Sequence, residues 1–327
     1  MATEKMIKTI GVVTSGGDAP GMNPCIRAVV RTALANNLRV MGVEDGFEGL
    51  IHGRFHAMGA RDVGGILLRG GTILHTARSE EFREPHGQRE AIRQMSNAEI
   101  DALVIIGGDG SLTGGQKLAE QGIPVIGIPG SIDNDIYGTD MCIGVDTALN
   151  TIVDAIDKLR DTASSHNRAF LIETMGRESG YLAIQAGIIA GAEMVLIPEE
   201  SVPVELVAKT IEHAYLRGKT HAIVVVAEGH TPHTNELAEL INAMDIGFTM
   251  RVTILGHIQR GGKPSAFDRL LASRFGYHAV QFLLNGQANV MVGLDGHDMV
   301  PVPLQTVVTN RKTLSTEYVE MAKTLAQ

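Results

Sequence analysis

Short runs of apolar, often β-branched residues alternate along the chain with stretches in which apolar residues recur at helical spacing. The apolar runs predict buried parallel strands, because a strand that is covered on both faces is apolar throughout. They lie at Thr9–Thr14, Arg39–Val43, Ala102–Ile106, Val125–Ile128, Arg168–Glu173, Met194–Ile197 and Ala222–Ala227. The helical patterns include Pro24–Ala35, Gln116–Gln121, Leu149–Thr162 and Tyr181–Ile189. This alternation predicts an α/β protein with mainly parallel sheets and right-handed crossovers.

The pattern also bears on domain organisation. No linker rich in proline or serine divides the sequence, so two domains would be joined by close-packed crossings. A boundary near residues 140–145 is indicated, because the loop Ile136–Cys142 is followed by a long helix. After Gly256 the strong strand runs end and a helical pattern covers Phe267–Leu284, so the chain could return there to the first domain.

Length, charge and cysteine content narrow the class of protein. The 327 residues allow two domains with a large core, and the formal net charge of −9 argues against a general binder of nucleic acid or membrane surfaces. Cys25 and Cys142 form neither a metal-binding spacing nor a disulfide framework, which favours a reduced, cytoplasmic setting. The first residues, MATEKMIKTI, lack the apolar core of a signal peptide, and no apolar stretch is long enough to cross a bilayer.

Two predicted strands end in acidic, glycine-rich segments. Ala102–Ile106 runs into Gly107–Ser111 (GGDGS), and the following strand runs into Pro129–Asp135 (PGSIDND). Ligands of open α/β sheets bind off the carboxyl ends of the strands, so both segments should face one crevice. Their carboxylates and accessible backbone N–H groups suit a phosphate chain, a magnesium ion and a base.

Each glycine-rich segment also has a purely structural interpretation. Gly16-Gly17 could be a tight turn, and GGDGS could be a turn whose Asp or Ser caps the next helix. Asp133 and Asp135 could form an Asx-turn, although in an extended loop two carboxylates at this spacing would face the same side. The recurrence of three such loops at strand ends favours phosphate binding. Because the chain has no Walker A lysine motif and no G-x-G-x-x-G that opens a helix, a nucleotide would be held by a different scheme.

Arginines beside glycine, serine, histidine or turn residues supply the positive charge that the composition lacks. Guanidinium groups bind phosphate in bidentate geometry, although most single surface arginines are simply solvated. Among the 12 histidines, His257 is a candidate for ligand binding only because Gln259 and Arg260 follow it. The arginines in question are Arg78, Arg168, Arg177, Arg251 and Arg260.

The ordered set of motifs resembles the bacterial ATP-dependent 6-phosphofructokinase family. The matching segments are TSGGDAPGMN (Thr14–Asn23), RGGT (Arg69–Thr72), GGDGS, PGSIDND, LRDTASSH (Leu159–His166), MGR (Met175–Arg177) and GHIQRGG (Gly256–Gly262). The resemblance covers almost the whole chain and fades after about residue 285. It implies two Rossmann-like three-layer α/β/α domains: a larger ATP-binding domain of residues 1–144 and about 258–308, and a smaller fructose 6-phosphate-binding domain of residues 145–257 and about 309–327.

The resemblance implies a role for each matching residue. Asp133 would be the general base for the sugar 1-hydroxyl, Asp109 would hold Mg²⁺, and Asp135 would lie near both. The transferring phosphoryl group would meet Gly17, Arg78, Ser131 and Arg177. The nucleotide would contact Gly17, Phe47, Arg78, Gly107, Gly108, Asp109, Gly110 and Ser111. The sugar phosphate would contact Ser131, Asp133, Asp135, Met175, Gly176, Arg177, Glu228, His257 and Arg260, joined by Arg168 and Arg251 from a neighbouring subunit of a homotetramer.

Two further sets of positions concern the phosphoryl donor and regulation. Glycines at Gly110 and Gly130 resemble ATP-dependent members, whereas pyrophosphate-dependent members tend to carry Asp and Lys there. An effector site for ADP and phosphoenolpyruvate is implied by Arg27, Arg31, Arg160, Glu193, Arg217 and Lys219. One arginine of that site is replaced by Ala60, with Arg61 adjacent, so the loss of a phosphate contact could weaken the response.

These observations predict a Mg²⁺-dependent transfer of the ATP γ-phosphoryl group to fructose 6-phosphate. One alternative is a kinase of another substrate class, because a GGDG loop also occurs in NAD and lipid kinases; the later motifs speak against it. The other alternative is a non-enzymatic nucleotide or sugar-phosphate sensor. A sensor would be expected to have lost part of the catalytic set, whereas Asp109, Asp133, Asp135 and Arg177 are all present.

Overall fold

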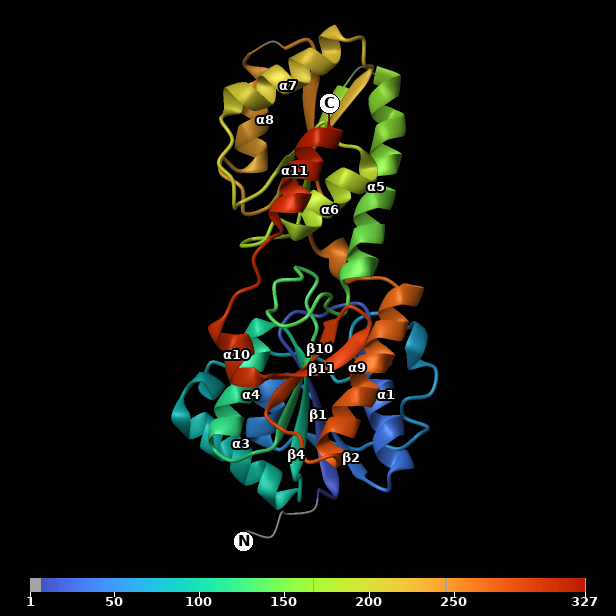
Figure 1. Cartoon of the computed structure of the whole chain (residues 1–327), viewed down its shortest axis with the longest axis vertical. Helices are drawn as coiled ribbons and strands as arrows, with labels where there is room; N and C mark the ends of the chain where they lie inside the picture. Colours follow the sequence, from blue (N-terminus) through green and yellow to red (C-terminus); the bar gives the residue numbers. More distant parts are fainter. Residues whose placement is uncertain (1–6, 167, 245, 327) are drawn as a thin grey trace. The chain divides into compact units, whose positions relative to one another are not determined.

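The computed structural model describes residues 7–166, 168–244 and 246–326, and the chain divides into two compact units (Figure 1). Unit 1 comprises Met1–Asp146 and Arg260–Lys312, and unit 2 comprises Thr147–Gln259 and Thr313–Gln327. The expectation that MATEKMIKTI is not a signal peptide falls mostly on residues outside the described part. Among the described helices, none combines the length and apolar character needed to cross a bilayer.

Unit 1 is built on a seven-stranded sheet with the order β11-β10-β5-β4-β1-β2-β3. Its strands are parallel except at the two edges, where β3 and β11 run antiparallel to their neighbours. Strands β1 and β4 are buried at every residue, which explains why both are rich in apolar side chains and lack charged ones. The bounds are β1 Thr9–Ser15, β2 Arg39–Val43, β3 Phe55–Ala57, β4 Ala102–Gly107, β5 Val125–Pro129, β10 Val290–Asp295 and β11 Asp298–Pro303.

Helices cover both faces of this sheet and give unit 1 its three layers. Helices α1 and α9 pack against each other on one side, while α3 and α4 lie on the other (Figure 1). The helices of unit 1 are α1 Met22–Ala35, α2 Gly46–His52, α3 Pro85–Asn97, α4 Asp109–Glu120, α9 Ala266–Leu284 and α10 Leu304–Thr309, with short 3₁₀ turns at Ile66–Leu68 and Glu81–Arg83.

Unit 2 contains a four-stranded, fully parallel sheet with the order β7-β8-β6-β9. Aliphatic side chains of β6 and β8 pack against α7 and α8 on one face, and α6 contacts β6, β7 and β8. The strands are β6 Arg168–Thr174, β7 Met194–Leu196, β8 His221–Ala227 and β9 Thr249–Ile254. The helices are α5 Val145–His166, α6 Tyr181–Ala190, α7 Val204–Leu216, α8 Thr234–Asn242 and α11 Thr316–Leu325, with a 3₁₀ turn at Gly256–Arg260.

The predicted α/β class and all seven predicted strands are confirmed, whereas the end of the chain was predicted wrongly. The sequence indicated no strong strand after Gly256, yet β10 and β11 form a hairpin that extends the sheet of unit 1. Gly293 interrupts the apolar run of β10, and Pro301 and Pro303 occur in β11. Both features weaken a strand pattern, and proline is tolerated here because β11 is an edge strand.

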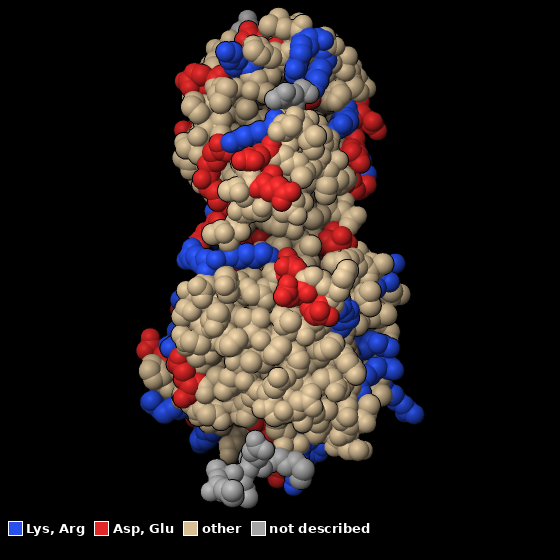
Figure 2. All heavy atoms as spheres, viewed as in Figure 1, with Lys and Arg blue, Asp and Glu red and all other residues tan. Residues whose placement is uncertain are grey.

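The distribution of charge on the face drawn in Figure 2 agrees with the acidic composition. Lysine and arginine side chains are interspersed with aspartate and glutamate, and a broad area of unit 1 carries few charges (Figure 2). No continuous basic surface is visible among the coloured residues of this face.

Candidate active site

A cavity of about 640 Å³ opens in unit 1 at the carboxyl ends of β1 and β4. Its floor is formed by the glycine-rich segments that follow these two strands, as the strand-end rule predicts. It brings together most of the residues predicted to bind ATP, namely Gly17, Phe47, Arg78, Gly108, Asp109, Gly110 and Ser111. Gly107 lies just behind this lining, at the end of β4.

Helix α4 starts earlier than the sequence pattern predicted, and this changes the geometry of the GGDGS segment. The helical pattern was expected to begin at Gln116, but α4 begins at Asp109, and Gly108 is its N-cap without a side-chain hydrogen bond. The predicted structural alternative of an Asp or Ser cap is therefore wrong. The first turn of a 12-residue helix instead faces the cavity, and its backbone N–H groups and dipole favour an anion such as phosphate.

The same helix supplies lining residues that sequence reasoning missed. Thr113, Gly114 and Lys117 line the cavity together with Gly110. They lie three, four and seven residues after Gly110, so they share one face of α4. A prediction that placed the start of the helix at Asp109 would have identified them.

An aromatic pair forms another wall of the cavity. The rings of Phe47 and Phe82 are stacked, with centroids 4.1 Å apart and an interplanar angle of 16°. A Cβ atom built on Gly114 would lie 2.6 Å from Phe47, so the glycine allows α4 to approach the ring. Phe82 was missed because only the folded chain brings the turn Glu81–Arg83 to Phe47.

Two glycines of the GGDGS segment have different physical roles. A Cβ on Gly107 would lie 2.4 Å from the carbonyl oxygen of Ser15, so this glycine is required where β1 and β4 approach each other. A Cβ on Gly110 would meet no atom within 4 Å, because this position faces the open cavity. Gly107 is thus explained by packing alone, and Gly110 is the position at which a side chain would compete with a ligand.

Several polar residues of the first motif support the loop. The Asn23 side chain donates hydrogen bonds to the carbonyl oxygens of Arg69 and Gly70, both at 3.1 Å, and accepts one from the backbone N–H of Ile73 at 2.8 Å. These contacts hold the RGGT segment against the start of α1. The Arg260 guanidinium belongs to unit 1 and donates to the carbonyl oxygen of Asp18 at 3.2 Å.

The acidic segment after β5 is connected to the nucleotide pocket through the sheet. The backbone N–H of Gly130 donates to the carbonyl oxygen of Gly107 at 3.0 Å, so the loops that carry Asp133 and Asp109 leave adjacent strands. The Ser131 hydroxyl donates to Asp135 Oδ1 at 2.9 Å and accepts from the backbone N–H of Asp133 at 3.3 Å. Ser131 therefore holds the carboxylate of Asp135 and the main chain at Asp133.

The acidic segment is not extended at Asn134, so the rule that residues two apart in an extended loop face the same side does not apply to Asp133 and Asp135. Asn134 has φ of 51°, in the left-handed region that asparagine tolerates better than most residues. Its buried side chain donates to the carbonyl oxygen of Asp140 at 3.1 Å and accepts from the backbone N–H of Cys142 at 3.0 Å. These side-chain hydrogen bonds determine how the segment is oriented, whereas in an extended strand the alternation of side chains would do so.

One carboxylate in the cavity of unit 1 fits the way in which Mg²⁺ is bound beside phosphate. Within residues 7–166, 168–244 and 246–326, no group of three or more His, Cys, Asp or Glu side chains could hold a metal ion. Mg²⁺ keeps several water ligands and commonly binds one or two carboxylates together with phosphate oxygens. Asp109, which lines the cavity at the start of α4, is such a carboxylate.

In unit 2, most of the residues predicted to bind sugar phosphate gather at the carboxyl ends of three adjacent strands. Met175 and Gly176 follow β6, Glu228 follows β8, and His257 lies in the turn after β9. The backbone N–H of Glu228 donates to the carbonyl oxygen of Thr174 at 2.9 Å, which joins two of these strand ends.

The buried side chain of Gln259 fixes the third strand end. Its amide nitrogen donates to the carbonyl oxygen of Gly256 at 2.9 Å, and its oxygen accepts from the backbone N–H of Met175 at 3.2 Å. Arg177 is 81% exposed and its Nε lies 3.2 Å from Glu228 Oε1. The exposed Arg177 therefore has a carboxylate partner that orients it without enclosing it.

Arg168 and Arg251 lie on adjacent parallel strands of unit 2. In the register of β6 and β9, Arg251 is opposite Phe170, which is two residues from Arg168. Side chains two residues apart on a strand share a face, so both arginines project from the same face of the sheet. This places the two guanidinium groups where they could bind one anion together.

The predicted effector residues are distributed over both units. Arg27 and Arg31 are one turn apart on α1 of unit 1. Arg160, Glu193, Arg217 and Lys219 belong to unit 2, where the Arg160 guanidinium donates to the carbonyl oxygen of Ala190. The buried Glu193 carboxylate accepts from Lys219 Nζ at 2.9 Å and from the backbone N–H of Ile223 at 2.6 Å. Ala60 and Arg61 are both exposed.

Comparisons with known proteins agree with this geometry. The phosphofructokinase family model matches residues 9–283. The ATP-dependent 6-phosphofructokinase of Thermotoga neapolitana is 51% identical over 321 residues, which covers 98% of this chain and 100% of the relative. That of Natranaerobius thermophilus is 48% identical over 320 residues, with the same coverage of 98% and 100%.

Solved structures extend the comparison to the fold. The phosphofructokinase from Pichia pastoris in the T-state has a TM-score of 0.88 and 37% identity, covering 94% of this chain but only 36% of that longer chain. The phosphofructokinase from Saccharomyces cerevisiae has a TM-score of 0.87 and 37% identity, covering 98% of this chain and 48% of the other. A pyrophosphate-dependent phosphofructokinase from Marinobacter aquaeolei, at 20% identity and a TM-score of 0.86, shares the fold. The chain belongs to the phosphofructokinase family.

Proposed function

We propose that this protein transfers the γ-phosphoryl group of ATP to the 1-hydroxyl of fructose 6-phosphate, giving fructose 1,6-bisphosphate and ADP. The observation that carries the proposal is the direct connection between the Gly110 pocket and the acidic segment. Two adjacent strand ends, linked by the hydrogen bond from Gly130 to Gly107, support a nucleotide pocket and a carboxylate pair in one unit. Phosphoryl transfer to a hydroxyl requires both elements.

The residues of unit 1 would act as follows. The start of α4 and the loop at Gly17 bind the ATP phosphates, and Arg78 stabilises the charge of the migrating phosphoryl group. Asp133 accepts the proton of the sugar hydroxyl, while Ser131 holds Asp135 in place. Mg²⁺ bound at Asp109 would screen the phosphate charges.

The residues of unit 2 would bind the sugar phosphate. Met175, Gly176, Glu228 and His257 lie at neighbouring strand ends, where ligands of parallel sheets bind. Arg177 stabilises the transferred charge. The half-buried Arg168 and the exposed Arg251 bind the 6-phosphate of a sugar held by a neighbouring subunit. We therefore assign ATP to unit 1 and fructose 6-phosphate to unit 2.

A homotetramer is part of the proposal and is supported by an apolar stripe on α9. Phe267, Leu270, Tyr277 and Leu284 are exposed and recur at spacings of three and seven residues, so they lie along one side of the helix. Leu270 is 63% exposed, which is unusual for a large aliphatic side chain in such a stripe. Contact with a second copy would cover this surface.

Regulation and location complete the proposal. We assign ADP and phosphoenolpyruvate to Arg27, Arg31, Arg160, Glu193, Arg217 and Lys219, with a weakened response because Ala60 offers no charge. A cytoplasmic location is supported by Cys25 and Cys142, which are both buried free thiols.

The proposal is tested by a coupled assay of fructose 6-phosphate with ATP or with pyrophosphate. We expect Mg²⁺-dependent turnover with ATP and at least about a hundredfold lower kcat/KM with pyrophosphate, since Gly110 leaves room for a nucleotide. NAD and diacylglycerol serve as alternative acceptors. Turnover with pyrophosphate alone would overturn the choice of donor, and binding of both substrates without turnover would favour a sensor.

A further inference from the structure

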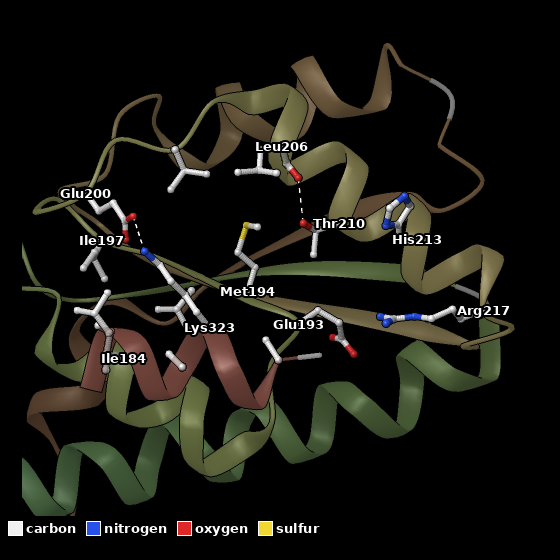
Figure 3. Close-up of a pocket in the computed structure, with 15 residues that line it drawn as sticks. Ile184, Glu193, Met194, Ile197, Glu200, Leu206, Thr210, His213, Arg217 and Lys323 are labelled. Atoms are coloured by element: carbon white, nitrogen blue, oxygen red, sulfur yellow. Dashed lines mark hydrogen bonds and ion pairs between the residues drawn. The ribbon is translucent and has the colours of Figure 1, made fainter. Parts of the chain in front are cut away.

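A second cavity, of about 470 Å³, lies within unit 2 beneath the C-terminal helix α11 (Figure 3). We call it the α11 cavity. Its walls come from α6, β7, α7 and α11. Most of its lining is aliphatic, including Ile184, Met194, Val195, Ile197, Val202 and Leu206. The cavity therefore offers a largely apolar compartment of the size that small-molecule sites commonly have.

Helix α11 closes this compartment loosely. It has no fully buried residue, although Val319, Ala322 and Ala326 turn toward the cavity. Leu206 on the facing helix α7 remains 49% exposed. Apolar side chains on both walls thus keep solvent contact that an apolar ligand between them would remove.

The two ends of the α11 cavity carry different charges. At one end, Lys323 on α11 is paired with Glu200 at 2.5 Å (Figure 3). At the other end lie Arg217, His213 and Glu193, and the Glu193 carboxylate is already bonded to Lys219 and to the backbone N–H of Ile223. Within the described part of the chain, no carboxylate lies within ion-pair distance of the Arg217 guanidinium. Among the described residues, the Arg217 guanidinium at this end is therefore left without a carboxylate in ion-pair contact.

We propose that the α11 cavity binds an amphipathic monocarboxylate, an unbranched fatty acid anion, with its carboxylate on Arg217 and its chain between α7 and α11. The charge selects an anion, because guanidinium groups bind carboxylates in bidentate geometry. The lining selects a hydrocarbon chain, because the walls at Met194, Leu206 and Val319 offer no charged partner along the length of the ligand. Loose closure by α11 supplies an entry for such a ligand.

Binding is tested with decanoate on the full-length protein by isothermal titration calorimetry without nucleotide. Decanol shares the chain but lacks the charge, and acetate shares the charge but lacks the chain. We expect saturable binding of decanoate below its micelle concentration, at least about tenfold tighter than either analogue. The variant Arg217→Met should bind decanoate and decanol equally, since the interaction between head group and guanidinium is lost.

A second variant tests the apolar compartment. Ala322→Trp should fill the cavity and weaken decanoate binding by at least about tenfold. Ile189→Trp is the matched control, because Ile189 is exposed on α6 and does not line the cavity. If Ala322→Trp misfolds by circular dichroism, Leu206→Glu replaces it, since this half-exposed position tolerates a carboxylate that repels the ligand. Unsaturable decanoate binding, equal affinity for decanol, or unchanged affinity in the cavity variant would overturn the proposal.

A failure of the α11 cavity proposal can be distinguished from a failure of the proposed function. Arg217 also belongs to the proposed effector set, so ADP and phosphoenolpyruvate are tested for their effect on the rate in the same preparations. An ADP response that persists in Ala322→Trp while decanoate binding is lost supports two distinct subsites. Decanoate binding in a protein without ADP response would contradict the effector assignment and leave the α11 cavity proposal intact.

Discussion

Lys312 donates a 2.9 Å hydrogen bond from its Nζ to the main-chain carbonyl oxygen of Asp140, which also accepts the side-chain amide of Asn134. A second bond runs from Lys312 to the carbonyl oxygen of Thr139 at 2.8 Å. Lys312 is the last residue of unit 1, so the end of that unit is tied to the loop that supports Asp133 and Asp135. Burial lowers the pKa of Lys312 from its usual value, while Cys142, Asp140 and Asp135 act in the opposite direction.

We expect Lys312→Met to lower kcat by about tenfold with little change in the KM for ATP. Methionine keeps the apolar stem but removes the charged donor, so the carbonyl groups of Thr139 and Asp140 each lose a hydrogen bond. A hydrogen bond to a charged group contributes about 1.5–3 kcal/mol to stability, and part of this would be lost. The loop would move, whereas the cavity at Gly110 does not include these residues. Steady-state kinetics with both substrates measure the split. A variant that is only less heat-stable, with unchanged kcat, would show that Lys312 has no positioning role; Lys312→Arg should retain most of the rate.

A second prediction concerns the side chain that Gly110 lacks. Gly110→Asp should raise the KM for ATP by at least about tenfold, because a carboxylate in the cavity would repel the nucleotide phosphates. The fold should be preserved, since a Cβ there meets no atom within 4 Å and an acidic residue suits the first turn of a helix.

Two companion variants isolate the cause. Gly110→Ala adds only a methyl group and should bind ATP almost normally, with a gain in helix stability of up to about 1 kcal/mol. Gly107→Ala should instead destabilise the whole of unit 1, because its Cβ would lie 2.4 Å from the carbonyl oxygen of Ser15. Thermal unfolding and ATP titration distinguish the two. A high KM in Gly110→Ala would mean that the volume of the side chain, not its charge, determines ATP binding.

Most of the strands that the sequence predicted are largely buried, as in β4, β5 and β8. Strands β4 and β8 are buried at nearly every residue and carry long apolar runs, ALVIIG and AIVVVA, because a strand that is covered on both faces has no polar side. The hairpin β10–β11 lies at the sheet edge, where glycine and proline are tolerated, and its sequence carries no comparable pattern. Burial, more than intrinsic propensity, therefore decides which strands can be predicted from a single sequence.

The candidate site shows the same division. Asp109 and Gly110 stand in a recognisable motif, so they were predicted, and the cavity contains both. Phe82 reaches the cavity only because the folded chain brings it to Phe47, and Lys117 only because α4 starts at Asp109. Contacts between distant segments and the phase of a helix depend on the fold, and neither can be obtained from local spacing.

Stability at acidic pH should depend on His230, which is buried in unit 2. Its Nδ1 donates to the carbonyl oxygen of Pro232 at 3.2 Å, and within the described residues Nε2 has no hydrogen-bond partner. Burial lowers the pKa of His230, because a charged ring would lose its hydration there. As pH falls through the unfolded pKa of about 6.5, the unfolded chain takes up a proton that the folded protein resists, so stability falls with pH.

The variant His230→Asn tests this dependence, since the asparagine amide can donate in place of Nδ1 and does not titrate. Urea unfolding of both proteins between about pH 5.5 and 8 should show a steeper loss of stability in the wild type below about pH 6.5. Parallel curves would mean that His230 keeps its ordinary pKa when folded. Burial also lowers the pKa of His278 in both proteins, so its contribution cancels in the difference.

The final prediction concerns the base. Asp133→Ser should lower kcat by at least about a hundredfold, because serine cannot accept the proton of the sugar hydroxyl at neutral pH. The hydrogen bond from the Asp133 backbone N–H to Ser131 is made by the main chain, so the loop should remain ordered in the variant. The KM for ATP should therefore stay near the wild-type value. Asp154→Ser, at an exposed position on α5, is the matched control and should be fully active. Near-normal turnover by a folded Asp133→Ser would remove Asp133 from the mechanism and direct attention to Asp135, whose carboxylate is held by the same hydroxyl.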